Sequence, residues 1–154
     1  FETFNHTVHT YCPAFRDHEF EAIMSYSSCI TFNSYSQLSR FLPTLRLSNK
    51  PLDIGLRINP ELSVVQNDLY NPCSPNSRFG VSITDLDSLD LSMINGLHFH
   101  ALCGNSAHDL SLILKKIEHH CPALLHQIKW FNWGGGHQMT HHHYDVDHLI
   151  SLIQ

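Results

Sequence analysis

The sequence predicts an α/β fold whose parallel sheet is part of a (β/α)8 barrel. Segments with strand character are each followed by a segment with helical character, and this alternation is typical of βαβ units with parallel strands. Apolar and polar residues alternate along the strands, which predicts one face packed on helices and one polar face. An open doubly wound sheet would bury apolar side chains on both faces. Only five strands are predicted and a closed barrel needs eight, so we interpret the chain as a piece of a barrel.

Each element follows from a local pattern of residue types. Strands are expected at 7–11, 29–33, 54–59, 97–101 and 130–133. Helices are expected at 17–26, from Ser34 onward, near 85–93, from Ser106 onward, and from 144 or 145 onward. Ser34 and Gln37 have the spacing of a capping box, and the apolar stripe that follows consists of Leu38, Phe41 and Leu42.

The alternation along the strands assigns side chains to the two faces of the sheet. It predicts that Leu56, Ile58, Leu97 and Phe99 face helices, and that Arg57, Asn59, His98 and His100 face the barrel axis. Polar inward residues near the carboxyl ends of strands are where (β/α)8 enzymes place their chemistry. The sequence therefore points to this edge for a functional site.

Composition and charge narrow the classes of partner. The chain has 154 residues, enough for one domain with a core, and a formal net charge of −5. The acidic balance argues against a nucleic-acid partner and weakly suits a cationic substrate. Five cysteines without a CxxC pair indicate reduced thiols in the cytoplasm, and no apolar run approaches the roughly 20 residues of a membrane span.

The triple glycine at 134–136 is the first candidate for ligand binding. Glycines between a strand and a helix leave backbone N–H groups free to approach an anion such as phosphate, although a flexible turn is the alternative. His100 is expected to face the same pocket, unless it is a polar filler of the barrel. Arg57 either balances a phosphate or carboxylate or serves as a structural hydrogen-bond hub. A phosphate cradle beside a flat imidazole predicts a planar phosphorylated cofactor.

A metal site is the second candidate. His98 and His100 project to one side of a strand, as two ligands of zinc or iron would. The other inward polar residues are Asn33, Arg57, Asn59 and Asn132, which are not good zinc ligands, and Arg57 would repel the cation. We therefore expect no metal site, and a metal-dependent barrel hydrolase stays as the alternative function.

Several short segments, taken together in their order along the chain, indicate a family more specifically than any one of them does. FNS at 32–34, LRINP at 56–60, SRFG at 77–80, FH at 99–100 and GGG at 134–136 together resemble the alanine-racemase-type barrel of the pyridoxal-phosphate decarboxylases. The wording of 8–11 (VHTY), 68–73 (DLYNPC), 97–103 (LHFHALC) and 144–147 (YDVD) resembles the polyamine branch of that family, whose members decarboxylate carboxynorspermidine and carboxyspermidine. The resemblance covers essentially the whole chain.

The resemblance implies a pyridoxal 5'-phosphate site and a carboxy-lyase reaction, with the pyridinium ring taking up electrons as CO2 leaves. The strands would be barrel strands three to seven. The cofactor-binding residues implied are His100 stacked on the ring, Arg57 beneath it, Cys103 near a second phosphate loop, and Gly134, Gly135 and Gly136 at the phosphate. A β-branched residue at Gly135 is expected to block the phosphate and to resist a positive φ.

The resemblance also implies that residues 1–154 are the central part of the barrel domain, without its first strands, strand eight and the C-terminal β-domain. The Schiff-base lysine of the family would precede residue 1, so we expect no catalytic residue in this chain and no activity of the chain alone. Gly104 and Asn105 depart from the family's usual acidic continuation after the cysteine. The complete protein is expected to be a cytoplasmic homodimer with a small cationic polyamine substrate.

Overall fold

Strands and helices alternate along the chain, as the sequence predicts. The computed structural model describes residues 7–65, 67–74 and 76–154. The strands are β1 (His9–Cys12), β2 (Cys29–Phe32), β3 (Asp53–Asn59), β4 (Val81–Ser82), β5 (Gly96–His98) and β6 (Trp130–Asn132). The helices are α1 (Asp17–Tyr26), α2 (Tyr35–Leu47), α3 (Ala107–His120), α4 (Pro122–Gln127) and α5 (Val146–Ile153), with the short 3-10 helices η1 (Asp68–Tyr70) and η2 (Ile83–Ser88).

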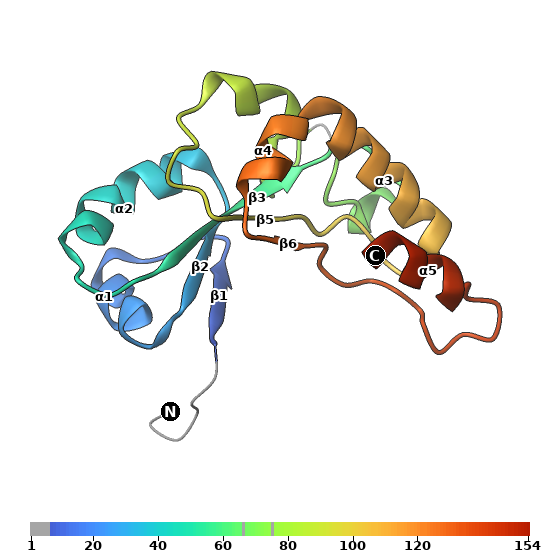
Figure 1. Cartoon of the computed structure of the whole chain (residues 1–154), viewed down its shortest axis with the longest axis horizontal. Helices are drawn as coiled ribbons and strands as arrows, with labels where there is room; N and C mark the ends of the chain where they lie inside the picture. Colours follow the sequence, from blue (N-terminus) through green and yellow to red (C-terminus); the bar gives the residue numbers. More distant parts are fainter. Residues whose placement is uncertain (1–6, 66, 75) are drawn as a thin grey trace.

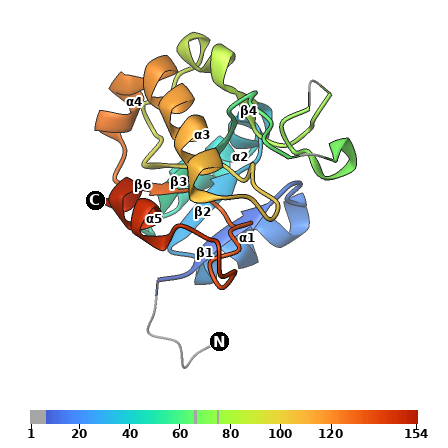
Figure 2. The ribbon, with the colours of Figure 1, turned by 90° about the vertical axis from the view of Figure 1, so that its right-hand side faces the viewer.

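The sheet is parallel throughout the described residues. Its strand order is β1-β2-β3-β5-β6, and the short β4 pairs with the carboxyl end of β3. The predicted sequential order of parallel strands is therefore confirmed. In Figure 1, α1 and α2 lie to the left of the sheet, and α3 and α4 lie above it. Figure 2 looks from the side of the loops that follow the strands, and the segment around η1 stands out at its right.

The apolar face of the sheet forms the core. Leu56, Ile58, Leu97 and Phe99 are each at most 1% exposed, so their predicted direction is confirmed. They belong to one cluster with apolar residues of the covering helices. Each fully buried side chain of this size contributes about 1.5–3 kcal/mol relative to an exposed one. At one end of the core, the stacked rings of Phe20 and Phe41 have centroids 4.0 Å apart.

Several predicted elements differ in detail. The helix expected near 85–93 is the 3-10 helix η2, and α4 was not predicted because its six residues are too few to show a helical period. The capping box expected at Ser34 is only half formed. Ser34 accepts from the Gln37 N–H, but the Gln37 side chain accepts from Asn33. A complete capping box starts α3, at Ser106 and Asp109.

An aromatic ring fills the amino-terminal half of the polar face. Trp130 in β6 lies over Gly96 and Gly55, its neighbours across the sheet. A Cβ added to Gly96 would lie 2.0 Å from the indole, and one added to Gly55 would lie 2.5 Å from it. The His9 ring meets Trp130 edge to face at 5.5 Å. Both glycines are therefore required by packing, and the open part of the polar face is at the carboxyl end.

We expect Gly96→Ala to destabilise the protein by about 1–3 kcal/mol, because the new methyl group overlaps the Trp130 ring. Trp130→Leu in the same protein should recover part of that loss. Gly135→Ala is the matched control, because its Cβ would meet only His100 at 3.9 Å. Urea unfolding followed by circular dichroism measures all variants. Equal stability of Gly96→Ala and the parent would contradict this packing.

Candidate functional site

Two loops meet at the carboxyl end of the sheet. One follows β5 and contains His100, Cys103 and Gly104. The other follows β6 and contains the triple glycine. The N–H groups of Gly104 and Asn105 both donate to the Gly136 carbonyl oxygen, at 2.8 and 3.1 Å. The structure therefore brings together the loop that contains His100 and the loop that contains the triple glycine.

The three glycines have different roles. Gly134 has a φ of +72° and Gly136 a φ of +99°, and added Cβ atoms would lie 2.6 Å from the Phe99 carbonyl oxygen and 2.2 Å from that of Leu102. Gly135 has no positive φ, so the expectation that it needs one is wrong. The left-handed turn is made by its neighbours. A Cβ at Gly135 would meet only the Cε1 atom of His100, at 3.9 Å, so the fold itself does not require glycine there.

The N–H groups of the three glycines also differ in their hydrogen bonding. The Gly134 N–H donates to the Asn132 Oδ1 atom at 2.8 Å and is not free for a ligand. No described residue accepts a hydrogen bond from the N–H of Gly135 or Gly136. Buried or half-buried amides normally find a partner. Of the predicted cradle, Gly135 and Gly136 can therefore donate to an anion, and Gly134 shapes the turn.

Arg57 is a buried cation that contacts the loop after β5. The residue is 6% exposed, and Nη2 donates to the His100 carbonyl oxygen at 3.4 Å. Nη1 donates to the Tyr11 hydroxyl. Among the described residues, no carboxylate forms an ion pair with Arg57. Arg57 is thus a hydrogen-bond hub that keeps its positive charge at the site, which suits an anionic ligand.

His98 and His100 lie side by side with ring centroids 6.4 Å apart. Partial desolvation lowers the pKa of the half-buried His98 and of the more exposed His100 below the ordinary value, and the charge of Arg57 lowers both further. The Nδ1 atom of His98 lies 3.2 Å from the Asn132 carbonyl oxygen. Because a carbonyl only accepts, His98 carries its proton on Nδ1 in this contact. Both rings are neutral near pH 7.

The metal alternative needs a third ligand beside this pair. Within residues 7–65, 67–74 and 76–154, no group of three or more His, Cys, Asp or Glu side chains is arranged to hold a metal ion. The described geometry gives this alternative no support.

Cys103 lies at the border of the site. Its N–H donates to the Asn105 Oδ1 atom at 2.7 Å, and its exposed side chain lines a cavity of about 460 Å³ together with Tyr70 and Asp109. Its neighbour Gly104 is hydrogen-bonded to Gly136. The backbone of this loop is therefore hydrogen-bonded to the glycine turn, whereas the exposed Cys103 lines the adjacent cavity.

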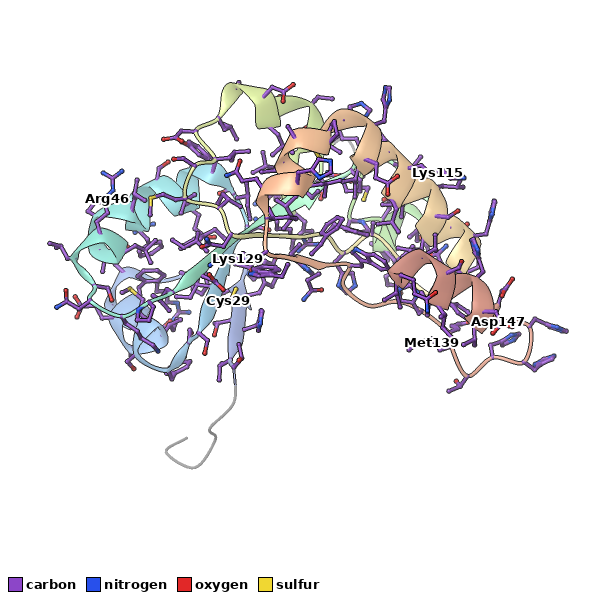
Figure 3. The ribbon with its side chains drawn as sticks, in the orientation of Figure 1. Cys29, Arg46, Lys115, Lys129, Met139 and Asp147 are labelled. Carbon is purple, nitrogen blue, oxygen red and sulfur yellow. The ribbon has the colours of Figure 1, made fainter. Side chains whose placement is uncertain are left out.

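The four lysines take up other positions. Lys50 donates to the last carbonyl groups of α1, and Lys129 pairs with Asp53 at 2.9 Å where β3 begins. Lys116 donates to the Glu61 carbonyl oxygen. Figure 3 shows Lys129 near Cys29, where the strands begin, and Lys115 on α3, whereas Met139 marks the loop beyond β6. None of these contacts brings a lysine to His100.

Two residues of the site were not predicted from the sequence. Tyr11 contacts Arg57 from β1, and Phe79 contacts it from the loop before β4, with the guanidinium carbon 4.6 Å from the centre of the Phe79 ring. The alternation of side chains along β1 places Tyr11 on the polar face, so this pattern could have predicted Tyr11 as a residue of the site. Phe79 comes from a loop, and only the fold brings it to Arg57.

Solved structures identify the class of fold. A diaminopimelate decarboxylase, 18% identical, aligns with a TM-score of 0.74 over 94% of this chain and 36% of its own. A second one, from Helicobacter pylori, has a TM-score of 0.63 over 87% of this chain and 39% of its own at 15% identity. At these identities the likeness shows the fold alone. The chain has the α/β fold of the barrel of alanine-racemase-type decarboxylases.

Closer relatives narrow the class, although no family model matches the chain. Carboxynorspermidine/carboxyspermidine decarboxylase of Campylobacter jejuni is 42% identical over 147 residues, which are 96% of this chain and 37% of the relative. Carboxyaminopropylagmatine decarboxylase of Synechocystis is 43% identical over 152 residues, 99% of this chain and 39% of the relative. The crystal structure of the Campylobacter jejuni carboxynorspermidine decarboxylase complexed with norspermidine has a TM-score of 0.82 at 39% identity, covering 98% of this chain and 37% of that one.

The chain is thus homologous to carboxynorspermidine/carboxyspermidine decarboxylase, and the family resemblance of its motifs is confirmed. It spans about two fifths of the length of the curated relatives it matches. None of the described helices is long and apolar enough to cross a membrane.

The geometry of the glycine turn predicts that substitution lowers stability at Gly136 but not at Gly135. Gly136→Ala should destabilise the protein by about 1–3 kcal/mol, because it forces a side chain into a left-handed conformation against the Leu102 carbonyl. Gly135→Ala should unfold at the same urea concentration as the parent. A loss of stability in Gly135→Ala equal to that in Gly136→Ala would contradict the assignment.

The low pKa values of His98 and His100 predict a dependence of stability on pH. In the unfolded chain these groups bind protons near pH 6.5, and in the folded protein only at lower pH. The stability they contribute above 6.5 is therefore lost as pH falls through the folded pKa values. His98→Gln should reduce the drop in unfolding free energy between about pH 7.5 and about pH 5. The exposed His18→Gln is the control, and identical drops in His98→Gln and the parent would refute this assignment.

Proposed function

We propose that this chain is the central barrel segment of a pyridoxal-phosphate-dependent carboxy-lyase that converts carboxynorspermidine or carboxyspermidine to norspermidine or spermidine and CO2. The observation that supports this most is the space at Gly135 that no described side chain fills, with two amides that no described residue accepts from and a neutral imidazole beside it. The proposal accounts for a glycine that the fold alone does not need. The similarity to decarboxylases over 96% of the chain points the same way.

The residues of the site fit pyridoxal 5'-phosphate. The Gly135 and Gly136 N–H groups would donate to the phosphate, and the positive charge of Arg57 would favour the anion. The neutral His100 ring would lie along the flat face of the cofactor, and the loop at Cys103 and Gly104 would border it. When bound, the cofactor supplies an electron sink for decarboxylation. His100 would hold and orient the cofactor rather than transfer a proton.

Parts outside residues 1–154 would complete the site. The four lysines of this chain are engaged or placed elsewhere, so the lysine that holds the cofactor would come from another segment of the complete protein. In this proposal the described strands are barrel strands three to seven. The first strands, strand eight and a C-terminal β-domain would belong to the rest of a cytoplasmic homodimer.

Three carboxylated polyamines are candidate substrates, because one relative, 43% identical where the first is 42% identical, is a carboxyaminopropylagmatine decarboxylase. All three carboxylated polyamines are cationic and suit an acidic protein with a net charge of −5. CO2 release from carboxynorspermidine, carboxyspermidine and carboxyaminopropylagmatine should be measured with the purified complete protein. We expect the first two to be preferred. Preference for the third would change the substrate, and turnover of none of them would overturn the function.

Cofactor binding provides a sharper test in the complete protein. Gly135→Val should weaken pyridoxal-phosphate binding about 10- to 100-fold, because the side chain fills the space over the amides, and each charge-assisted hydrogen bond is worth about 1.5–3 kcal/mol. His100→Phe should retain more affinity than His100→Ala, because it keeps a flat ring. Titration followed by the absorbance of the cofactor measures each variant. Unchanged binding in Gly135→Val, or activity that follows added zinc, would favour the hydrolase instead.

A further inference from the structure

Three separate segments of the chain hold the Arg57 side chain. Tyr11 of β1 accepts a hydrogen bond from Nη1, and its ring centre lies 5.3 Å from the guanidinium carbon. Phe79 offers a second aromatic ring, 4.6 Å from the same carbon. The His100 carbonyl oxygen accepts from Nη2 at 3.4 Å. The cation therefore contacts two rings, one hydroxyl and one carbonyl group.

Hydrogen-bond directions in this cluster are fixed by Asn33. Its Oδ1 atom lies 2.9 Å from the Tyr11 hydroxyl, which donates to it, and it also accepts from the Gly80 N–H at 3.3 Å. Its Nδ2 donates to the Arg78 carbonyl oxygen at 2.7 Å. Asn33 thus fastens the backbone on both sides of Phe79. Because the Tyr11 proton is directed to Asn33, the oxygen lone pairs of Tyr11 are left for the Arg57 guanidinium.

We propose that Tyr11 is a positioning residue of the site: with Phe79 it holds the Arg57 guanidinium against the end of β5, and Arg57 thereby fixes where the His100 ring stands. Tyr11 touches neither His100 nor the glycine turn in any described contact, so it acts through Arg57. Its relevance to catalysis rests on the proposed function, whereas its contact with Arg57 does not.

Tyr11 can position Arg57 because this guanidinium is buried and has few hydrogen-bond acceptors. A buried guanidinium that lacks a carboxylate partner among the described residues needs other acceptors, and each acceptor restricts where it can stand. Without the Tyr11 hydroxyl, Nη1 loses its acceptor and the guanidinium can turn toward water. It would then pull away from the His100 carbonyl group and from the two imidazoles. Among the described residues, the charged or titratable groups that face these imidazoles are Arg57, the other imidazole of the pair at 6.4 Å and, beside His98, the Tyr11 ring at 5.5 Å.

The test uses the complete protein without cofactor, so that it does not depend on the proposed reaction. Nuclear magnetic resonance of labelled histidine, assigned with His98→Gln and His100→Gln, gives the pKa of each imidazole. Tyr11→Phe keeps the ring and removes only the hydroxyl, and the exposed Tyr70→Phe is the matched control. We expect Tyr11→Phe to raise the pKa of both His98 and His100, as Arg57→Gln does, whereas Tyr70→Phe leaves them unchanged.

A double-mutant cycle separates positioning from a general structural effect. Once Arg57→Gln has removed the charge, adding Tyr11→Phe should change neither pKa further. If Arg57→Gln does not fold, Phe79→Leu replaces it and should raise the same two pKa values. The proposal is overturned if Tyr11→Phe leaves both values unchanged, or if its effect is as large in the Arg57→Gln protein as in the parent.

The consequence for the proposed function is measured apart from this. Tyr11→Phe should weaken pyridoxal-phosphate binding several-fold in the parent and not at all in the Arg57→Gln protein. If the pKa cycle succeeds and no variant or parent binds pyridoxal phosphate, the proposed function fails and the positioning role stands. If the parent binds the cofactor and Tyr11→Phe moves neither quantity, the positioning role fails alone.

Discussion

The pairing of β3 with β5 is the constraint on which the site depends. In this parallel register Leu56 lies beside Leu97 and Arg57 beside His98. Because side chains alternate along a strand, one register sends both leucines to the helices and both polar residues to the other face. A slip by one residue would bury Arg57 among the helices and expose Leu56 on the polar face. Burying Arg57 and exposing Leu56 would both cost free energy. The hydrophobic core therefore fixes the register, and the register fixes the direction of the functional side chains.

Packing then divides the polar face into two halves. Near the amino ends of the strands, Trp130 covers Gly55 and Gly96 and closes the surface with an aromatic ring. Near the carboxyl ends, the glycine turn and the loop after β5 share hydrogen bonds through Gly136, and the space beside Gly135 stays open. Glycine thus has two different roles here. Gly55 and Gly96 make room for the Trp130 ring, whereas Gly135 leaves a space that no described side chain fills.

The charge of Arg57 and the neutral imidazoles determine which ligands suit the open half of the polar face, at the carboxyl ends of the strands. The positive charge of Arg57 is not compensated by any described carboxylate, because its partners are rings, a hydroxyl and a carbonyl group. That charge and the burial of the imidazoles keep His98 and His100 neutral, so the positive field is concentrated on one group. Such a site favours an anion next to a flat neutral ring, which is the combination that a phosphorylated aromatic cofactor requires.

Much of the fold and part of the site follow from sequence alone. Period-2 alternation assigned Leu56 and Arg57 to opposite faces, and strand–helix alternation gave the parallel order, because both are local consequences of backbone geometry. The triple glycine marked the turn, but not that Gly134 is hydrogen-bonded to Asn132 or that Gly135 has no positive φ. Nor did the sequence join Tyr11 and Phe79 to Arg57. Those contacts link residues distant along the chain, and only the folded sheet decides which of them meet.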